Sequence, residues 1–159
     1  MNKQKLIEAA CARLEKDLAA LSAAAEAAYE GAVGDESKPE NEYDTRALEA
    51  SYIATAQSKR AAEIAELIGA YRRAVPRTFG PDDPIDATAL VELEHGRKRS
   101  TVFLMPKGSG LTVEVEGRAV QIIGPGAPLG EALMGLKEGD EAFVETGRGT
   151  QTYEILSVT

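Results

Sequence analysis

The sequence predicts an α+β fold, in which an N-terminal antiparallel coiled-coil helical hairpin precedes a small, mostly antiparallel β-sheet domain with one short helix. Three observations lead to this prediction. Apolar and small residues follow a heptad spacing in two segments, 3–30 and 47–71. Proline and glycine gather at 75–89. Beyond that point apolar residues alternate with polar ones, as in strands that bury one face.

The two heptad segments predict helices that pack against each other. The first seam runs through Ile7, Cys11, Leu14, Leu18, Leu21, Ala25 and Ala28. The second seam runs through Ala47, Ala50, Ala54, Gln57, Ala61, Ile64, Ile68 and Tyr71. Because the second seam is mostly alanine near the connection, we expect the helices to approach closely there. A lone helix pair is marginally stable in water, so we expect the hairpin to depend on the rest of the chain for support.

The second half of the chain is predicted to form six strands and one helix. The strands are expected at 89–94, 100–105, 111–116, 118–123, 141–146 and 152–158, separated by turns that contain glycine. The helix is expected at 128–135, with Pro128 in its first turn and Gly135 as its C-terminal cap.

These elements divide the chain into three predicted parts. Residues 1–75 form the coiled-coil hairpin, and the connection at 31–46 is its tip. Residues 76–88, which are rich in proline, form a linker. Residues 89–159 form the sheet domain.

Composition and charge narrow the classes of protein to which the chain can belong. With 18 basic and 26 acidic side chains, the net charge is −8, so DNA and anionic membranes would repel it. We therefore expect no sequence-specific DNA binding and no membrane binding. A cytoplasmic location follows from the lack of an apolar segment long enough to cross a bilayer. A single cysteine and a single histidine argue against an internal disulfide, structural zinc and a Ser-His-Asp triad.

The tip of the hairpin is acidic. It carries carboxylates at Asp35, Glu36, Glu40, Glu42 and Asp44. Ser37 and Glu40 have the spacing of a capping box, which predicts that the second helix begins at Ser37. Acids at a helix N-terminus complement the helix dipole, and this explains part of the cluster. The alternative is a site for a hard cation such as Mg²⁺, which takes oxygen ligands and shares its shell with phosphates and water. Both interpretations are open at this point.

Several stretches resemble one family. The tip, GDESKPENEYDTRALEAS, with Glu40, Asn41 and Tyr43, resembles the acidic tip of the bacterial GreA/GreB transcription factors. FLMPKGSG, VQIIGPGAPLGEALMGLKEGDEAFVE and the closing TYEILSV are similar in order and spacing to the C-terminal domain of that family. The resemblance covers essentially the whole chain.

The resemblance implies an accessory factor rather than an enzyme. An FKBP-like C-terminal domain would dock on the rim of RNA polymerase, and the hairpin would enter the secondary channel. In members that stimulate cleavage, tip carboxylates help to hold a second Mg²⁺ and orient water, and the polymerase hydrolyses the 3′ end of backtracked RNA. The implied partner is RNA polymerase, with the RNA 3′ end met indirectly. No cofactor would be bound stably, and Mg²⁺ would be shared with the polymerase.

Carried over by residue, the resemblance gives Asp35, Glu36 and Glu40 as the carboxylates that would assist the polymerase site and hold a metal jointly with it. The family pattern is Asp-x-x-Glu-Asn, whereas here Ser37 stands where the Asp would fall. Because a misplacement of about 1 Å can cost roughly a hundredfold in rate, cleavage activity does not follow from the resemblance. Two alternatives therefore stay open: a non-cleaving regulator in the same channel, and a coiled-coil protein-interaction module.

Two further groups are candidates for docking on the polymerase. Arg97, Lys98 and Arg99 form a basic run between two predicted strands of an otherwise acidic domain, and the alternative is a solvated hairpin end. Pro128 and Leu129 begin the short helix and match a Ser-Pro-aliphatic run of the family, with Ala127 in place of the usual Ser.

Overall fold

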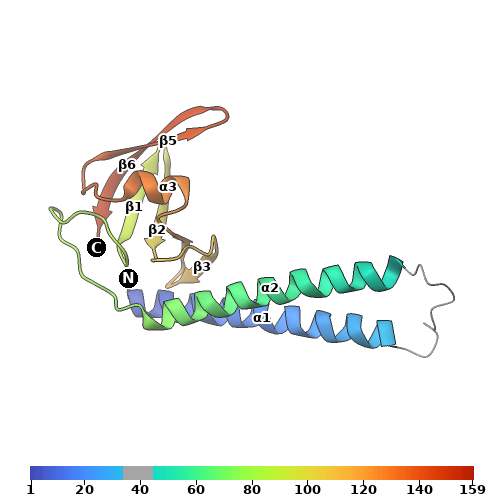
Figure 1. Cartoon of the computed structure of the whole chain (residues 1–159). Coiled ribbons are helices and arrows are strands. Elements are labelled where there is room, and N and C mark those ends of the chain that lie inside the picture. The colour runs from blue at the N-terminus through green and yellow to red at the C-terminus, as the bar shows by residue number, and fades with distance from the viewer. Residues whose placement is uncertain (34–44) are drawn as a thin grey trace. The chain divides into compact units, whose positions relative to one another are not determined.

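A computed structural model of the chain describes residues 1–33 and 45–159, which form two compact units (Figure 1). The first unit is Met1–Cys11 together with Gly69–Thr159, and the second is Ala12–Ile68. The tip carboxylates Asp35, Glu36 and Glu40, and the predicted helix start at Ser37, lie outside the described residues.

Two long helices confirm the predicted hairpin segments. Helix α1 is Lys3–Val33 and helix α2 is Thr45–Arg73. The Asn2 side chain caps α1, because its Oδ1 accepts hydrogen bonds from the backbone N–H groups of Gln4 at 2.9 Å and Lys5 at 3.3 Å. Helix α2 ends just before Pro76, which cannot continue a helix.

In the second unit, α1 and α2 run antiparallel and side by side (Figure 1). Among the side chains of this unit that the structure describes, four apolar ones are buried, and all belong to one end of the unit: Leu14, Ile64, Leu67 and Ile68. Farther along the predicted seams, Leu18, Leu21, Ala25, Gln57 and Ala61 are half-buried. The predicted seam residues Ala28 and Ala54 are exposed. The heptad spacing is thus present, but the helix pair buries the seam at one end only.

All six predicted strands and the short helix are confirmed. The strands are β1 Leu90–His95, β2 Lys98–Leu104, β3 Thr112–Val115, β4 Arg118–Ile123, β5 Glu141–Thr146 and β6 Gly149–Val158, and helix α3 is Pro128–Leu133. They form one sheet in the order β3-β4-β2-β1-β6-β5. Strands β2 and β4 are parallel, and every other pair is antiparallel.

The β3–β4 turn explains how a parallel pair enters this sheet. Strand β3 folds back onto β4 through a turn of Glu116 and Gly117, which both have positive φ, at 54° and 75°. Positive φ at both central residues is what a tight β-hairpin turn requires. The hairpin returns β4 along β2, with Phe103 opposite Ile122.

One face of the sheet packs on α3 and on residues of the predicted linker. The buried cluster on this side comprises Phe79, Ile85, Ala89, Val91, Leu93, Val102, Leu104, Ile123, Leu133, Ala142, Ile155 and Val158. Ile85 is tied in further, because its N–H donates to the Leu136 carbonyl at 2.8 Å and its carbonyl accepts from Gly135 at 2.9 Å. The segment 76–88 therefore has no helix or strand, but it is packed against the sheet.

The opposite face of the sheet is buried over only part of its area. Leu90 on β1 lies opposite Phe103 on β2, and both are buried. The start of α1 and the end of α2 contribute buried residues to the same unit: Leu6, Ile7, Ala10, Cys11 and Tyr71. Along β1 beyond Leu90, the residues of the same face are Glu92 and Glu94. This face thus changes from apolar to acidic within one strand.

The two compact units do not coincide with the predicted parts 1–75, 76–88 and 89–159, because the helix ends and the proline-rich segment group with the sheet. Those bounds, as limits of separable domains, stay a prediction. Within the residues that the structure describes, no helix has the length and apolar character needed to cross a membrane.

Candidate functional site

The predicted metal-assisting site at the tip falls within 34–44, outside the described residues, so Asp35, Glu36 and Glu40 stay predictions. In the described ranges 1–33 and 45–159, no group of three or more His, Cys, Asp and Glu side chains is placed to hold a metal ion. The candidate sites that can be built from geometry therefore belong to the sheet domain.

We call the run Arg97–Arg99 the basic turn. Arg97 lies in the turn between β1 and β2, whereas Lys98 and Arg99, which were predicted to lie between the strands, are the first two residues of β2. The backbone reverses at Gly96, whose φ of 62° suits glycine, and His95 lies opposite Lys98. His95 holds this end of β1 against β6, because its Nδ1 lies 2.8 Å from the Thr152 carbonyl oxygen and its ring lies 4.9 Å from that of Tyr153. The basic side chains thus project from a fixed turn.

The three basic side chains are exposed, but they differ in whether an acidic side chain pairs with them. Arg99 Nε lies 3.3 Å from Glu94 Oε2, so its charge is partly matched. For Arg97 and Lys98 the described part of the chain provides no ion pair. These two are the cations that a partner surface could meet.

The second predicted docking group lies where β4 leads into α3. Ala127 occupies the N-cap position with an extended backbone, and no side chain caps the helix there. Pro128 is exposed, whereas Leu129 is half-buried and packs against the core cluster. Pro128 is therefore free to contact a partner, and Leu129 mainly holds α3 on the sheet.

Three glycines bring backbone segments together beside Pro128. A Cβ atom added at Gly124 would lie 2.3 Å from the Gly108 nitrogen, and one added at Gly108 would lie 2.3 Å from the Gly124 nitrogen. A Cβ at Gly130 would lie 2.0 Å from the Gly124 carbonyl oxygen. No residue other than glycine fits these positions without movement of the backbone. The sequence predicts glycine-containing turns at Gly108 and Gly124 and a helix that includes Gly130, but it does not predict their close approach.

The close approach of the backbone at Gly108, Gly124 and Gly130, which we call the glycine crossing, borders an open hollow of about 440 Å³. We call this hollow the glycine hollow. Its lining residues are Pro106, Lys107, Gly108, Gly110, Gln121, Ile123, Gly124, Pro125, Gly126 and Ala127. None of them carries a carboxylate, an imidazole, a thiol or a hydroxyl. Lys107 is the ionisable residue among them. The hollow therefore has the shape to receive a partner's side chain, but it holds no carboxylate or imidazole that could act as a base beside that lysine.

Lys3 is the lysine with the most altered ionisation, and its surroundings are structural. Its Nζ donates to the Arg77 carbonyl and lies 4.8 Å from the centre of the Phe79 ring. Burial, and secondarily the charge of Arg77, lowers the pKa of Lys3 from 10.5 to about 8. This contact ties the start of α1 to the segment before the sheet and belongs to neither candidate docking group.

Comparison with known proteins bears on the sheet domain above all. Residues 85–159 match the family model described as transcription elongation factor, GreA/GreB, C-term. A 33-residue stretch is 54% identical to "Transcription elongation factor GreA" of Desulfovibrio desulfuricans. That alignment covers 21% of this chain and 20% of the relative, so it spans about a fifth of either protein.

Likenesses to solved structures extend over nearly the whole chain. The GreA factor homolog 1 (Gfh1) of Thermus thermophilus has 19% identity, a TM-score of 0.38 and coverage of 95% of both chains. The Gfh1 of Thermus aquaticus has 24% identity and a TM-score of 0.40, and the likeness covers 95% of this chain and 94% of that one. At these TM-scores neither likeness is used to place a residue or a partner.

Proposed function

Through its C-terminal domain, residues 85–159, the chain belongs to the GreA/GreB family, and on this premise we propose that it is a transcription elongation factor that binds RNA polymerase. The observation that carries the proposal is the family match over a domain that the structure resolves as one sheet with α3 packed on it. The factor is an accessory to the polymerase and not itself the enzyme.

In this proposal the sheet domain supplies the docking surface. The glycine hollow and the exposed Pro128 offer shape, and Arg97 and Lys98 offer unmatched positive charge. Exposed charges at the edge of an interface act mainly on the association rate, whereas filled hollows act on the dissociation rate. The two groups should therefore be separable by kinetics.

The hairpin acts as the arm that carries the tip into the secondary channel. Helices α1 and α2 contain 31 and 29 residues. At a rise of 1.5 Å per residue, helices of this size are about 45 Å long, which suits a probe of a deep channel. The half-buried seam positions keep this arm slim, as a narrow channel requires.

At the tip, Glu40 with Asp35 or Glu36 would assist the polymerase by sharing a Mg²⁺ ion and orienting water. Glu40 has the Glu-Asn context that resembles the cleaving members of the family, and Asp35 and Glu36 are the acids that precede it in the sequence. Carboxylates, phosphate oxygens and water are the ligands that Mg²⁺ prefers, so a site completed by the polymerase and RNA is chemically consistent.

A cleavage assay with backtracked transcription complexes tests the tip. With purified polymerase and Mg²⁺, the wild-type chain should shorten the RNA from its 3′ end. Glu40→Ala should abolish this stimulation while leaving polymerase binding nearly unchanged, because the lost interaction acts in the transition state. Asp44→Ala, which removes an acid four residues further along the sequence, is the matched control and should be mild.

The same assay separates the alternatives. If the chain never stimulates cleavage but displaces a cleaving GreA protein, it is a channel regulator without cleavage activity. The presence of Ser37 where the family pattern has Asp then explains the loss of cleavage. A chain that neither cleaves nor competes does not work in the channel, and the coiled-coil interaction module then replaces the proposal.

Docking is tested by matched charge variants of the sheet domain. The double change Arg97→Gln and Lys98→Gln should slow association with the polymerase and reduce its dependence on salt. The control, Lys137→Gln with Arg148→Gln, removes the same charge from exposed positions elsewhere in the domain. Equal effects of the two pairs would reduce the basic turn to a solvated hairpin end.

A further inference from the structure

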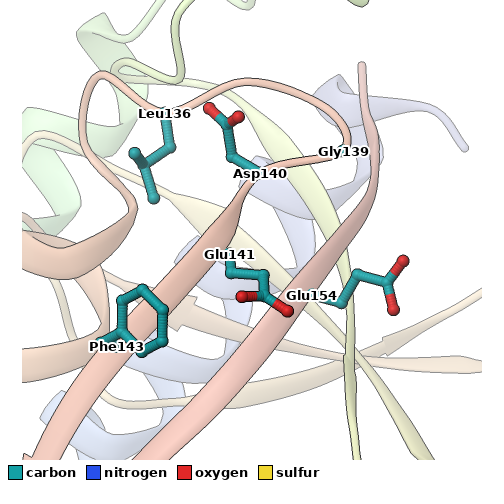
Figure 2. Close-up of a pocket in the computed structure, with 6 residues that line it drawn as sticks. All are labelled: Leu136, Gly139, Asp140, Glu141, Phe143 and Glu154. Carbon is teal, nitrogen blue, oxygen red and sulfur yellow. The ribbon is translucent and has the colours of Figure 1, made fainter.

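The sheet around Phe143 is uncovered, and this region is separate from the glycine hollow. Phe143 lies in the middle of the edge strand β5, and its side chain is 58% exposed. Beside it is an open hollow of about 630 Å³, which we call the Phe143 hollow (Figure 2). Its lining residues are Leu136, Gly139, Asp140, Glu141, Phe143 and Glu154. The two hollows share no lining residue.

The strand register places three glutamates in one row next to this hollow. Glu94 on β1 lies opposite Glu154 on β6, and Glu154 lies opposite Glu141 on β5. Residues that are directly opposite in a sheet share a face, with Cβ atoms roughly 4.5–5.5 Å apart. Glu141 and Phe143 also share that face, since alternate residues of a strand point the same way.

The negative charge of this row is matched at one end only. Glu94 lies 3.3 Å from Arg99, and its neighbour Glu92 lies 3.0 Å from Arg118. For Glu141 and Glu154, by contrast, the residues described by the structure provide no cation. Like charges placed directly opposite each other destabilise a sheet. The pair Glu141 and Glu154 therefore lowers the stability of the sheet, and no cation among the described residues offsets this loss.

The chemistry of the hollow selects the class of partner. A polyanion is repelled by the row, which argues against nucleic acid and anionic lipid. Among the described residues no three carboxylates converge closely enough to hold a metal ion. An arginine side chain fits, because its planar guanidinium can donate to two carboxylates at once and stack on an aromatic ring. Leu136 and Phe143 leave apolar surface for the residue beside it.

We propose that the Phe143 hollow binds an arginine-bearing segment of a partner protein, with the guanidinium between Glu141 and Glu154 and against the Phe143 ring. The charge of the hollow selects this occupant: the exposed Phe143 ring lies near Glu141 on the edge strand β5 and near Glu154 on the neighbouring strand β6, and no described residue pairs with either carboxylate. This contact is separate from polymerase docking through the glycine hollow and the basic turn, and the proposal of an arginine site does not depend on that docking.

The test uses the full chain, labelled with ¹⁵N, and a short blocked peptide of alternating arginine and leucine as the probe. Amide shifts should concentrate at 139–145 and 152–155. Replacing Glu141 and Glu154 by Gln should weaken binding about fivefold, the range expected for one exposed charge contact. Phe143→Ala should weaken it by about threefold, in keeping with an exposed cation–π contact.

The matched control is Glu114→Gln with Glu131→Gln, which removes the same charge from exposed positions on β3 and α3. This pair should leave the peptide affinity unchanged. Shifts spread over the whole acidic surface, or an equal loss of affinity in the control pair, would overturn the proposal. Polymerase binding measured on the same Glu141 and Glu154 variant should be retained, so failure here is distinct from failure of the elongation-factor proposal.

Discussion

The sheet domain and the hairpin arms use apolar residues in different ways. In the sheet domain, strands, α3 and the 76–88 segment converge on one cluster of buried side chains that includes Leu93 and Ile155. In the described part of Ala12–Ile68, buried apolar side chains are confined to one end, and seam residues such as Leu21 are half-buried. Both regions have a regular apolar pattern, but only the first closes it into a core.

The difference shows what each region can tolerate. A core of interlocking side chains constrains sequence tightly, whereas a slim helix pair needs little more than small or aliphatic residues along one stripe. The family match, 85–159, lies in the region with the core. The arm can therefore change its sequence, and with it the chemistry of the tip, while the sheet domain keeps its fold.

The same truncation in both regions gives the largest expected contrast. Leu93→Ala removes a fully buried side chain and should lower the free energy of unfolding by about 2–5 kcal/mol. Leu21→Ala, at a half-buried seam position, should cost less than about 1 kcal/mol. Urea unfolding of the full chain, followed by circular dichroism and by NMR signals of the sheet, gives both values. Comparable losses at the two sites would remove the distinction between core and arm.

An added methyl group should disturb the glycine crossing at Gly124 but not at the nearby Gly126. Gly124→Ala would place a Cβ atom against the Gly108 backbone and should destabilise the domain by about 1–3 kcal/mol, the usual cost of overpacking. Gly126→Ala has nothing within 4 Å of the added atom and should be nearly neutral. Thermal unfolding distinguishes the two. An unchanged stability of Gly124→Ala would mean that the backbone at the glycine crossing can move apart without loss of free energy.

The link between the start of α1 and the sheet domain should depend on pH. Because the pKa of Lys3 falls from 10.5 in the unfolded chain to about 8 in the fold, the unfolded chain binds one more proton between these values. The free energy of unfolding should therefore rise with pH across this window. Lys3→Met should lack this rise, so the difference between the two proteins, measured by urea unfolding from pH 7 to 10, isolates Lys3. A constant difference would contradict the assigned environment.

The smallest effect concerns the glutamate row of the sheet. Glu154→Lys replaces the central repulsive charge by one that attracts Glu94 and Glu141, and should stabilise the chain by about 0.2–1 kcal/mol. The same change at Glu114, which lies opposite Ala119, should have little effect. The gain should shrink as salt is added. Destabilisation by Glu154→Lys would mean that the carboxylate has a structural role.

The elements of the fold could be predicted because their periodicity is local. Alternating residues identified every strand, and Pro128 identified the start of α3. The parallel pairing of β2 with β4 could not be predicted, because strand order depends on contacts between distant segments. The prolines of 76–88 suggested a linker, yet Phe79 and Ile85 are apolar exceptions within it, and both are buried in the core.

The candidate sites could be predicted only as residue types. The basic turn and Pro128 were identified from sequence, and their exposure fits the predicted role without testing it. The glycine crossing depends on how closely Gly108 and Gly124 approach each other in space. The glutamate row depends on the pairing register of β5 with β6. Neither can be predicted from the sequence. The tip carboxylates Asp35, Glu36 and Glu40 lie outside the described residues and stay predictions.

The most direct test of the central claim is equilibrium binding of the full chain to RNA polymerase in competition with a GreA protein. The proposed function, which rests on the family match of residues 85–159, predicts saturable binding of one chain per polymerase. This binding should be displaced completely by GreA and weakened by the Arg97→Gln and Lys98→Gln pair. Absence of binding, or binding that excess GreA leaves unchanged, would contradict the claim that this chain acts on RNA polymerase as an elongation factor.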